Sequence, residues 1–156
     1  MASVSLSTSE DIIVVAVSDD ARLGVDVEVL FSARRLSGSG DVAQRVRDVA
    51  DVLGVDAGDE RDVLQRWVRV EAVLKADGRG LRVDPRDVRF VEEDADDHDN
   101  DRDENHNHND DSAGLTTGAP RWRAAVRDDA DVVYRGMDLA LASGVVGAVA
   151  HAADLG

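Results

Sequence analysis

Residues 23–30 read LGVDVEVL, and this short stretch decides the first part of the fold. Because successive side chains of a strand point to opposite faces, its alternation of apolar and polar residues predicts a β-strand. Three valines share one face, which we expect to belong to the core: Val25, Val27 and Val29. Gly24, Asp26 and Glu28 share the other face. Two carboxylates beside a glycine that leaves room for a ligand form a site-like pattern; the plainer interpretation is a solvent face on an edge strand.

Two helices are predicted downstream of this strand. Residues 41–53 and 59–76 each place apolar residues at helical spacing. Asp41 and Asp59 stand where the N-caps belong, since an aspartate oxygen can accept a bond from the first free backbone N–H groups. Gly78 follows the second segment and is the expected end of that helix.

The second helix carries two neighbouring stripes. One is apolar and is the expected core stripe: Val63, Trp67, Val70 and Leu74. The other stripe begins with apolar residues and continues with Glu71 and Lys75, so we expect this pair at the margin of the buried face. The plain interpretation of this pair is an i,i+4 surface ion pair, which contributes only about 0.2–0.5 kcal/mol.

The remaining strands are predicted from short apolar or alternating runs bounded by polar and glycine turns. They are residues 12–17, 88–92, 121–126, 137–142 and 144–151. Because strands are followed by helices and then by strands again, the pattern indicates an α+β fold. We expect an antiparallel sheet packed against two or three helices, with residues 1–156 forming a single domain.

Composition excludes several classes of protein. The chain of 156 residues has 33 acidic and 18 basic residues and a net charge of -15, which argues against nucleic acid as a partner. It has no cysteine, as expected for a reducing compartment. Its apolar stretches are far shorter than the roughly 18–20 residues of a membrane span, and its start shows no secretory signal. These features predict a cytoplasmic protein without a membrane partner.

Much of the charge lies in one tract. Residues 92–111 hold 11 acids and one arginine, and such a sequence cannot bury enough apolar surface to fold. We therefore predict a disordered acidic insert over residues 93–118. The alternative is a metal-sequestering segment, with three histidines as ligands: His98, His106 and His108.

Two segments resemble the signatures of a known family. GVDVE at 24–28 is similar to the G-(I/V)-D-(I/V)-E strand of the 4'-phosphopantetheinyl transferases of the surfactin-synthetase-activating type. WVRVEAVLKADGRGL at 67–81 resembles the family's W-x-x-K-E-(A/S)-x-x-K-x-x-G-x-G-L helix, and DLALASGVVGAVA at 138–150 resembles its last two strands. The resemblance implies the transferase-like α+β fold.

The resemblance also implies an activity and its residues. Asp26, Glu28 and Glu71 would hold Mg²⁺ against the pyrophosphate of coenzyme A. Glu71 would accept the proton of a serine hydroxyl on an acyl or peptidyl carrier protein, and Lys75 would neutralise phosphate charge. The coenzyme contacts implied are Thr8, Lys75 and Gly78. The implied reaction would transfer 4'-phosphopantetheine to the serine, and the chain would then be a holo-carrier-protein synthase.

The chain departs from the family pattern at two positions and in extent. Thr8 stands where the family has a histidine that touches a coenzyme phosphate, and Val70 stands where a lysine precedes the helix glutamate. The resemblance starts near the junction of the family's two halves. We therefore expect a homo-oligomer, or pairing with a chain that supplies the other half.

Two alternatives to transfer remain open. The first is a protein of this fold that has lost transfer, and that binds a carrier-tethered intermediate or catalyses another step of polyketide or peptide biosynthesis. The second is a non-catalytic interaction protein that acts through its acidic insert.

Overall fold

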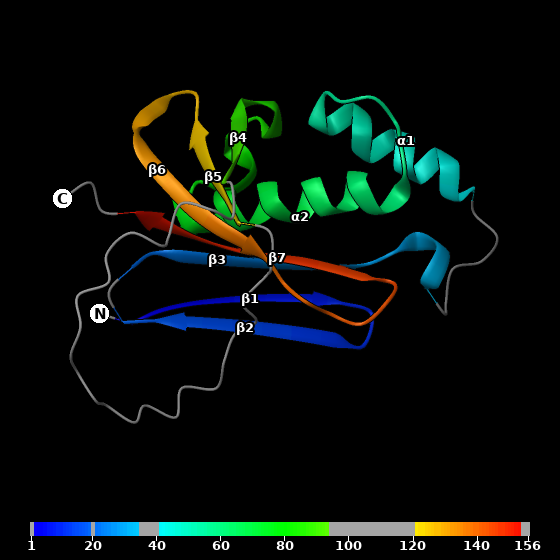
Figure 1. Ribbon diagram of the computed structural model, residues 1–156, viewed down its shortest axis with the longest axis horizontal. Coiled ribbons are helices and arrows are strands. Elements are labelled where there is room, and N and C mark those ends of the chain that lie inside the picture. Colours follow the sequence, from blue (N-terminus) through cyan, green and yellow to red (C-terminus); the bar gives the residue numbers. More distant parts are fainter. Residues whose placement is uncertain (1, 20, 35–40, 94–120, 154–156) are drawn as a thin grey trace, which may run out of the picture.

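A computed structural model describes residues 2–19, 21–34, 41–93 and 121–153 (Figure 1). It is an α+β structure with two antiparallel sheets. The strands are β1 (Ser3–Ser9), β2 (Ile12–Ser18), β3 (Leu23–Val29), β4 (Val88–Glu93), β5 (Arg121–Val126), β6 (Asp129–Asp138) and β7 (Val145–Ala153). The helices are α1 (Val42–Leu53) and α2 (Glu60–Asp77), with short 3-10 turns η1 (Phe31–Ala33), η2 (Gly80–Arg82) and η3 (Pro85–Asp87).

The elements form three layers. The large sheet has the strand order β3-β7-β6-β5-β4, and β1 pairs only with β2 in a separate hairpin. Figure 1 shows α2 running along β3 and β7, with the β1–β2 hairpin on the far side of β3. The sheet therefore lies between a helical layer and a hairpin layer.

Both helices begin and end as their sequences predict. The Asp41 carboxylate accepts a bond from the backbone N–H of Ala43 at 3.0 Å, and Asp59 accepts one from Arg61 at 2.8 Å. Gly78 ends α2 in the left-handed conformation, with φ of 85°. Caps of this kind satisfy backbone groups that the helix itself leaves unpaired, so they fix where α2 stops.

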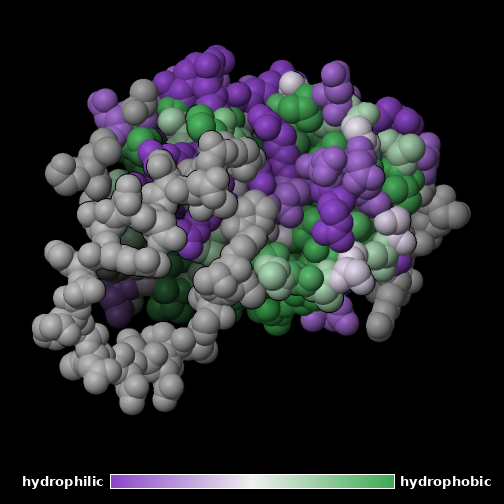
Figure 2. Space-filling model, viewed as in Figure 1, coloured by the Kyte–Doolittle hydropathy of each residue, from purple (hydrophilic) through white to green (hydrophobic). Residues whose placement is uncertain are grey.

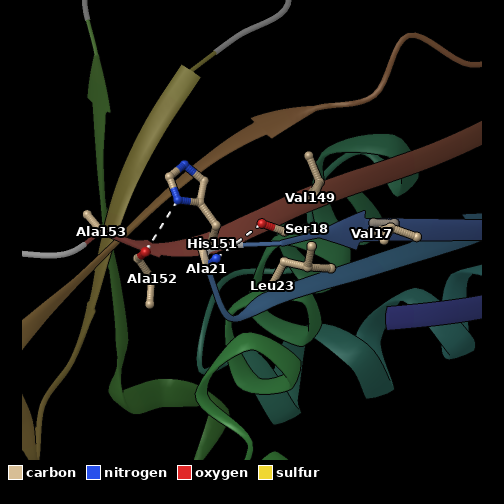
Figure 3. A pocket seen from close by; sticks show the side chains of 9 residues that line it. Val17, Ser18, Ala21, Leu23, Val149, His151, Ala152 and Ala153 are labelled. Carbon is tan, nitrogen blue, oxygen red and sulfur yellow. Dashed lines mark hydrogen bonds between the residues drawn. The ribbon is translucent and has the colours of Figure 1, made fainter. Parts of the chain in front are cut away.

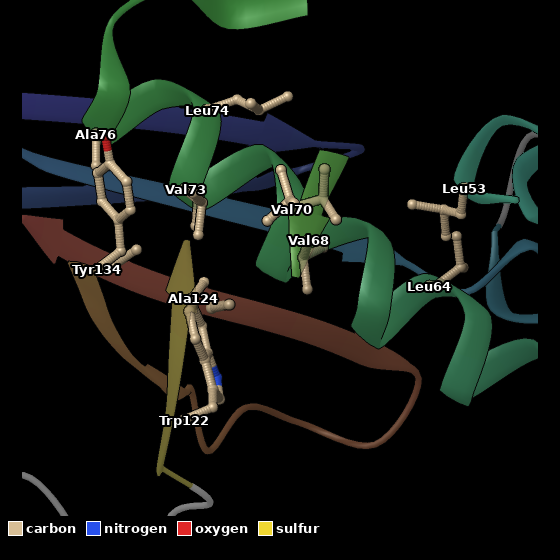
Figure 4. Packing of buried hydrophobic residues seen from close by; sticks show 14 of the residues in the cluster. Leu53, Leu64, Val68, Val70, Val73, Leu74, Ala76, Trp122, Ala124 and Tyr134 are labelled. Carbon is tan, nitrogen blue, oxygen red and sulfur yellow. The ribbon is translucent and has the colours of Figure 1, made fainter. Parts of the chain in front are cut away.

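The main core lies between α2 and the sheet (Figure 4). Trp122 and Tyr134 are both fully buried there. A Cβ on Gly136 would lie 2.2 Å from the Trp122 ring, so only glycine lets the indole cross β6. Helix α2 contributes much of the opposing apolar surface: Val63, Leu64, Val68, Val70, Val73 and Leu74. Trp67 is only partly buried at the edge of this cluster.

A second, smaller core joins the sheet to the hairpin. Val27, Val29 and Val145 are buried in it, and Ile12 and Val14 pack against them. The valine face of β3 is therefore a core face, as its alternation predicts.

Most predicted strands are confirmed to within two residues, but the strand at 137–142 is wrong. Strand β6 instead covers Asp129–Asp138, and the following residues 139–142 lie in no strand. Their leucines pack over Gly147, where a Cβ would lie 2.9 Å from Leu141 Cδ1. The apolar residues at 139 and 141 thus belong to a loop that covers β7.

The sequence also predicts an acidic insert and the absence of a membrane span. Residues 94–118 of the predicted acidic insert lie outside the described residues, whereas Glu93 ends β4. In the part of the chain that the structure describes, no helix combines the length and the apolar character needed to cross a membrane.

Candidate functional site

Helix α2 runs along β3 and packs directly against its backbone at Gly24, and this contact, called the crossing below, builds the site. A Cβ on Gly24 would lie 2.0 Å from the Ala72 carbonyl oxygen and 2.6 Å from the Ala76 nitrogen. The glycine is therefore needed for the approach of the helix, and the expectation that it makes room for a ligand is wrong. The approach brings the margin of α2 that carries Glu71 and Lys75 onto the carboxylate face of β3.

Asp26 lies buried beneath this crossing, with only 5% of its surface exposed. The interpretation of its face as an ordinary solvent face is wrong, because α2 covers it. Lys75 Nζ donates to Asp26 Oδ1 at 2.7 Å and to the Val25 carbonyl at 3.0 Å. Lys75 therefore spans the helix–strand contact with bonds to β3.

The two carboxylate oxygens of Asp26 are used unequally. Ser7 also donates to Oδ1, at 2.7 Å, while Oδ2 is buried without a hydrogen-bond partner. A buried carboxylate oxygen with no partner is costly, because its hydration is lost without replacement. This oxygen has an unused acceptor position inside the site.

Glu28 lies two residues further along β3 and is held from both sides. Ser9 donates to Glu28 Oε2 at 2.9 Å, and Arg34 Nη2 lies 2.9 Å from the same oxygen. Arg34 also donates to the Val29 carbonyl at 3.1 Å and lies over the Phe31 ring. These contacts fix the Glu28 carboxylate on the side of the site nearest the hairpin turn.

Sequence reasoning missed the serines that support the carboxylates. The serine hydroxyls of β1 accept hydrogen bonds from the backbone N–H groups on the free edge of β3, with N–O distances of 3.0–3.3 Å. There are four successive pairs: Ser3–Leu23, Ser5–Val25, Ser7–Val27 and Ser9–Val29. Ser7 and Ser9 then donate their own hydrogens to Asp26 and Glu28. The period-2 serines in SVSLSTS were the signal that could have revealed this ladder.

The acids near the crossing interact electrostatically. Burial is the main factor that raises the pKa of Glu71, and the charges of Asp26 and Glu28 raise it further. Burial also raises the pKa of Glu28, with a contribution from Asp26, although the bond from Ser9 opposes the shift. Burial and the neighbouring acids thus favour the protonated forms of Glu28 and Glu71, and a bound cation would relieve both effects.

The site suits a cation with oxygen ligands, although it is not a closed cage. Among the described residues, no three His, Asp or Glu side chains are grouped closely enough to ligate one ion. Mg²⁺ does not require such a group, because it usually binds one or two carboxylates and keeps waters or substrate phosphates as its other ligands. The unpartnered Oδ2 of Asp26 and the neighbouring Glu28 and Glu71 fit that chemistry.

Three other residues singled out by the sequence lie apart from the carboxylates. Thr8 is exposed on the hairpin face opposite to Ser7 and Ser9. Gly78 ends α2, and a Cβ there would meet open space. Val70 is 1% exposed within the main core. The structure thus brings Asp26, Glu28, Glu71 and Lys75 together, and it does not bring Thr8 to them.

Arg69, which precedes Val70 in α2, links the helix to β6. Arg69 Nε donates to Asp138 Oδ1 and Arg69 Nη2 donates to Oδ2, both at 2.8 Å. Trp122 Nε1 also donates to Asp138 Oδ1, at 3.0 Å. A bidentate pair of this kind fixes the guanidinium firmly. It ties α2 to the end of β6.

Two hollows lie outside the carboxylate cluster. One of about 460 Å³ lies at the end of the hairpin, between Val17, Leu23 and Val149, with His151 at its margin (Figure 3). The other, of about 580 Å³, is lined by Ile12, Val29 and the turn at 143–145, among others. None of the four clustered residues lines either hollow.

Comparison with known proteins adds no assignment. The chain matches no protein-family model, and a search of curated proteins finds no significant relative.

Proposed function

We propose that this chain is a Mg²⁺-dependent 4'-phosphopantetheinyl transferase with a transferase-like fold, acting on a serine of an acyl or peptidyl carrier protein in the cytoplasm. The observation that carries the proposal is the convergence of Asp26, Glu28, Glu71 and Lys75 where α2 crosses β3. These four residues come from the two segments, 24–28 and 67–81, that resemble the family's signatures. Their convergence is what a shared site requires.

The acids of the cluster would hold the cation. Asp26 offers its unpartnered Oδ2, and Glu28 is positioned beside it by Ser9 and Arg34. Bound Mg²⁺ would offset the negative charge that develops on the pyrophosphate of coenzyme A. Lys75, whose ammonium bonds Asp26 and the Val25 carbonyl, would offer its third N–H to a phosphate oxygen.

Glu71 is the proposed base. A carboxylate with a raised pKa is a stronger base than an ordinary one, and such tuning is common where a proton must be accepted near neutral pH. The serine hydroxyl of the carrier loses its proton to Glu71, directly or through one water, and its oxygen attacks the β-phosphorus of coenzyme A. A P–O bond to the serine forms, the phosphoanhydride bond breaks, and adenosine 3',5'-bisphosphate leaves.

Three observations favour a second function. Val70 is buried, Thr8 faces away from the acids, and Arg69 is paired with Asp138. The coenzyme contact that the resemblance implies at Thr8 thus has no counterpart in the described chain, and neither Val70 nor Arg69 takes the place of the family's helix lysine. These observations favour a protein of this fold that binds a carrier-tethered intermediate, or catalyses another biosynthetic step, without transfer.

Intact mass spectrometry separates the two functions. The chain is incubated with coenzyme A, Mg²⁺ and several apo carrier proteins, and the carriers are weighed. A gain of one phosphopantetheine group that needs Mg²⁺ supports transfer. No gain on any carrier contradicts transfer and favours the second function.

Two variants make this experiment specific to the site. Glu71→Gln removes the proposed base while keeping the size of the side chain, and should reduce the rate by at least about 100-fold. Asp48→Asn is the matched control, because Asp48 is an exposed acid on α1 outside the cluster. Equal loss of activity in both variants would contradict the role given to Glu71.

A further inference from the structure

The outer face of the β1–β2 hairpin is apolar and exposed. The two-residue period of the strands puts five aliphatic side chains on it, and they are 54–68% exposed: Val4, Leu6, Ile13, Val15 and Val17. They face one another across the hairpin, with Val4 opposite Val17 and Leu6 opposite Val15. Thr8, opposite Ile13, is the only other residue of this face within the two strands. In Figure 2, hydrophobic surface lies along the lower edge of the molecule, where Figure 1 places the hairpin.

The hairpin is therefore inverted relative to an ordinary surface hairpin. An antiparallel sheet with one wet face normally buries its apolar residues and exposes its polar ones. Here β1 buries Ser5, Ser7 and Ser9 against β3 and exposes Val4 and Leu6. The serines explain the inner face, because they pair the edge N–H groups of β3. Nothing within the described chain explains the outer face.

The size of the face suits a modest protein contact. Five aliphatic side chains at this exposure offer an apolar area on the order of 500 Å², as large as the biggest patches of soluble monomers. Two such faces in contact would bury about 1,000 Å² in total, the lower limit for a specific interface. An interface at this lower limit is expected to be weak, so the test belongs at micromolar concentrations and above.

A second copy of the chain meets the requirements of this face. The face carries no charged residue, so the complementary surface on its partner would be a flat, neutral, apolar strand surface of equal size. The same hairpin related by a two-fold axis has that surface by construction. Two sheets can pack in this way with their side chains interdigitated at a separation of about 10 Å.

We infer that the outer face of the β1–β2 hairpin is the contact surface between two copies of this chain. The inference does not depend on the proposed activity. It does reach the candidate site, because Ser7 and Ser9, on the inner face of the same strand, bond Asp26 and Glu28. Pairing of the outer faces would hold in place the strand that orients both carboxylates.

Charge supplies a second signature of this dimer. Each copy has a net charge of -15, so two copies repel at long range although the contact itself is neutral. Added salt screens that repulsion and strengthens apolar contacts. The dimer should therefore become tighter as salt is added, whereas a contact held by ion pairs would become weaker.

Sedimentation velocity across the micromolar range tests the inference. The wild type should shift from monomer to dimer, and Val15→Asp, which puts a charge at the centre of the face, should weaken association at least tenfold. Val15→Thr keeps the β-branched shape and is the variant to use if the charged one fails to fold. Val91→Asp is the matched control, because Val91 is a 68% exposed valine on β4, outside the hairpin.

The outcomes are decisive in each case. A wild-type dimer that is tightened by salt, weakened in Val15→Asp (or in Val15→Thr, if the charged variant fails to fold) and kept in Val91→Asp supports the inference. A wild type that stays monomeric throughout overturns it. So does association that survives both Val15 variants, that is lost equally in Val91→Asp, or that continues beyond the dimer.

Discussion

Asp26 and Asp77 are the two buried acids among the described residues, and their oxygens are used very differently. Asp77 has a donor on each oxygen: Tyr134 donates to Oδ1 at 2.8 Å, and Arg79 Nε donates to Oδ2 at 2.6 Å. Asp26 receives both Ser7 and Lys75 on Oδ1 and nothing on Oδ2. One carboxylate is saturated by the fold, and the other keeps an acceptor position in reserve.

The electrostatic surroundings of Asp77 stabilise its negative charge, whereas those of Asp26 include two other acids. Burial alone would raise the pKa of Asp77, but the hydrogen bonds from Arg79 and Tyr134 together outweigh it and lower the pKa. Around Asp26 the neighbouring acids Glu28 and Glu71 both have raised pKa values. The fold thus stabilises the negative charge of Asp77 at the end of α2. Where α2 crosses β3 it brings several acids together, and this proximity is unfavourable. We interpret the first as structural and the second as a binding site.

The largest expected effect comes from removing the saturated carboxylate. Asp77→Asn should destabilise the protein by about 2 kcal/mol, because the new amide would face the donors of Arg79 and weaken the bond to the buried Tyr134. Asp26→Asn should cost less, about 1 kcal/mol, because its carbonyl can still accept from Ser7 and Lys75, and the lost attraction to Lys75 is offset in part by weaker repulsion with Glu28. Urea unfolding of both variants at neutral pH measures the difference. Equal losses would contradict the comparison.

A smaller effect of opposite sign is expected at Glu71. Its pKa is raised above the ordinary value of 4.5, so protonation stabilises the folded state below that pH, and this stability is lost as the pH rises through the folded-state pKa. Glu71→Gln should therefore be more stable than the wild type at pH 7, by up to about 0.5 kcal/mol for a partly exposed group.

The pH dependence distinguishes this gain from a simple packing effect. The advantage of Glu71→Gln should disappear below pH 4.5, where the wild-type side chain is neutral too. Asp77 has a lowered pKa, so its contribution is present above 3.8 and is lost as the pH falls through the folded-state value. Thermal unfolding across this range should show the two variants approaching the wild type from opposite sides.

The smallest effect is expected from the acidic tract. Glu93 and Arg121 are directly paired in the β4–β5 ladder, so an Asn-Gly turn can replace residues 94–120 without a change of register. The replacement should alter stability by less than about 0.5 kcal/mol, since the tract has almost no apolar residues to bury. A much larger fall in the melting temperature would show that the tract stabilises the fold around both carboxylates.

The sequence predicts the parts of the fold that rest on local patterns. The caps Asp41 and Asp59, the strand at 23–30 and the apolar stripe with Val63 and Leu74 all follow from spacing alone. Strand β1 was not predicted, because its polar face is made of serines whose partners are backbone groups of another strand. Strand β6 was missed because leucines beyond its end resembled strand residues.

The site was predictable in its residues and not in its contacts. Period-2 and helical spacing single out Asp26, Glu28, Glu71 and Lys75, and the structure brings all four together. The role of Gly24 was wrong, because a close approach between two backbones depends on the tertiary crossing. For the same reason, spacing cannot reveal that Lys75 bonds Asp26 or that Oδ2 stays unpartnered.

Thermal unfolding with and without Mg²⁺, in the presence of coenzyme A, tests most directly whether the open carboxylate is a binding site. The wild type should be stabilised by about 2.7 kcal/mol when Mg²⁺ is 100 times its Kd. Asp26→Asn should lose this response, while Asp77→Asn and the exposed Asp48→Asn should keep it. A wild type that Mg²⁺ leaves unchanged, or an Asp26→Asn variant that responds as the wild type does, would contradict the account.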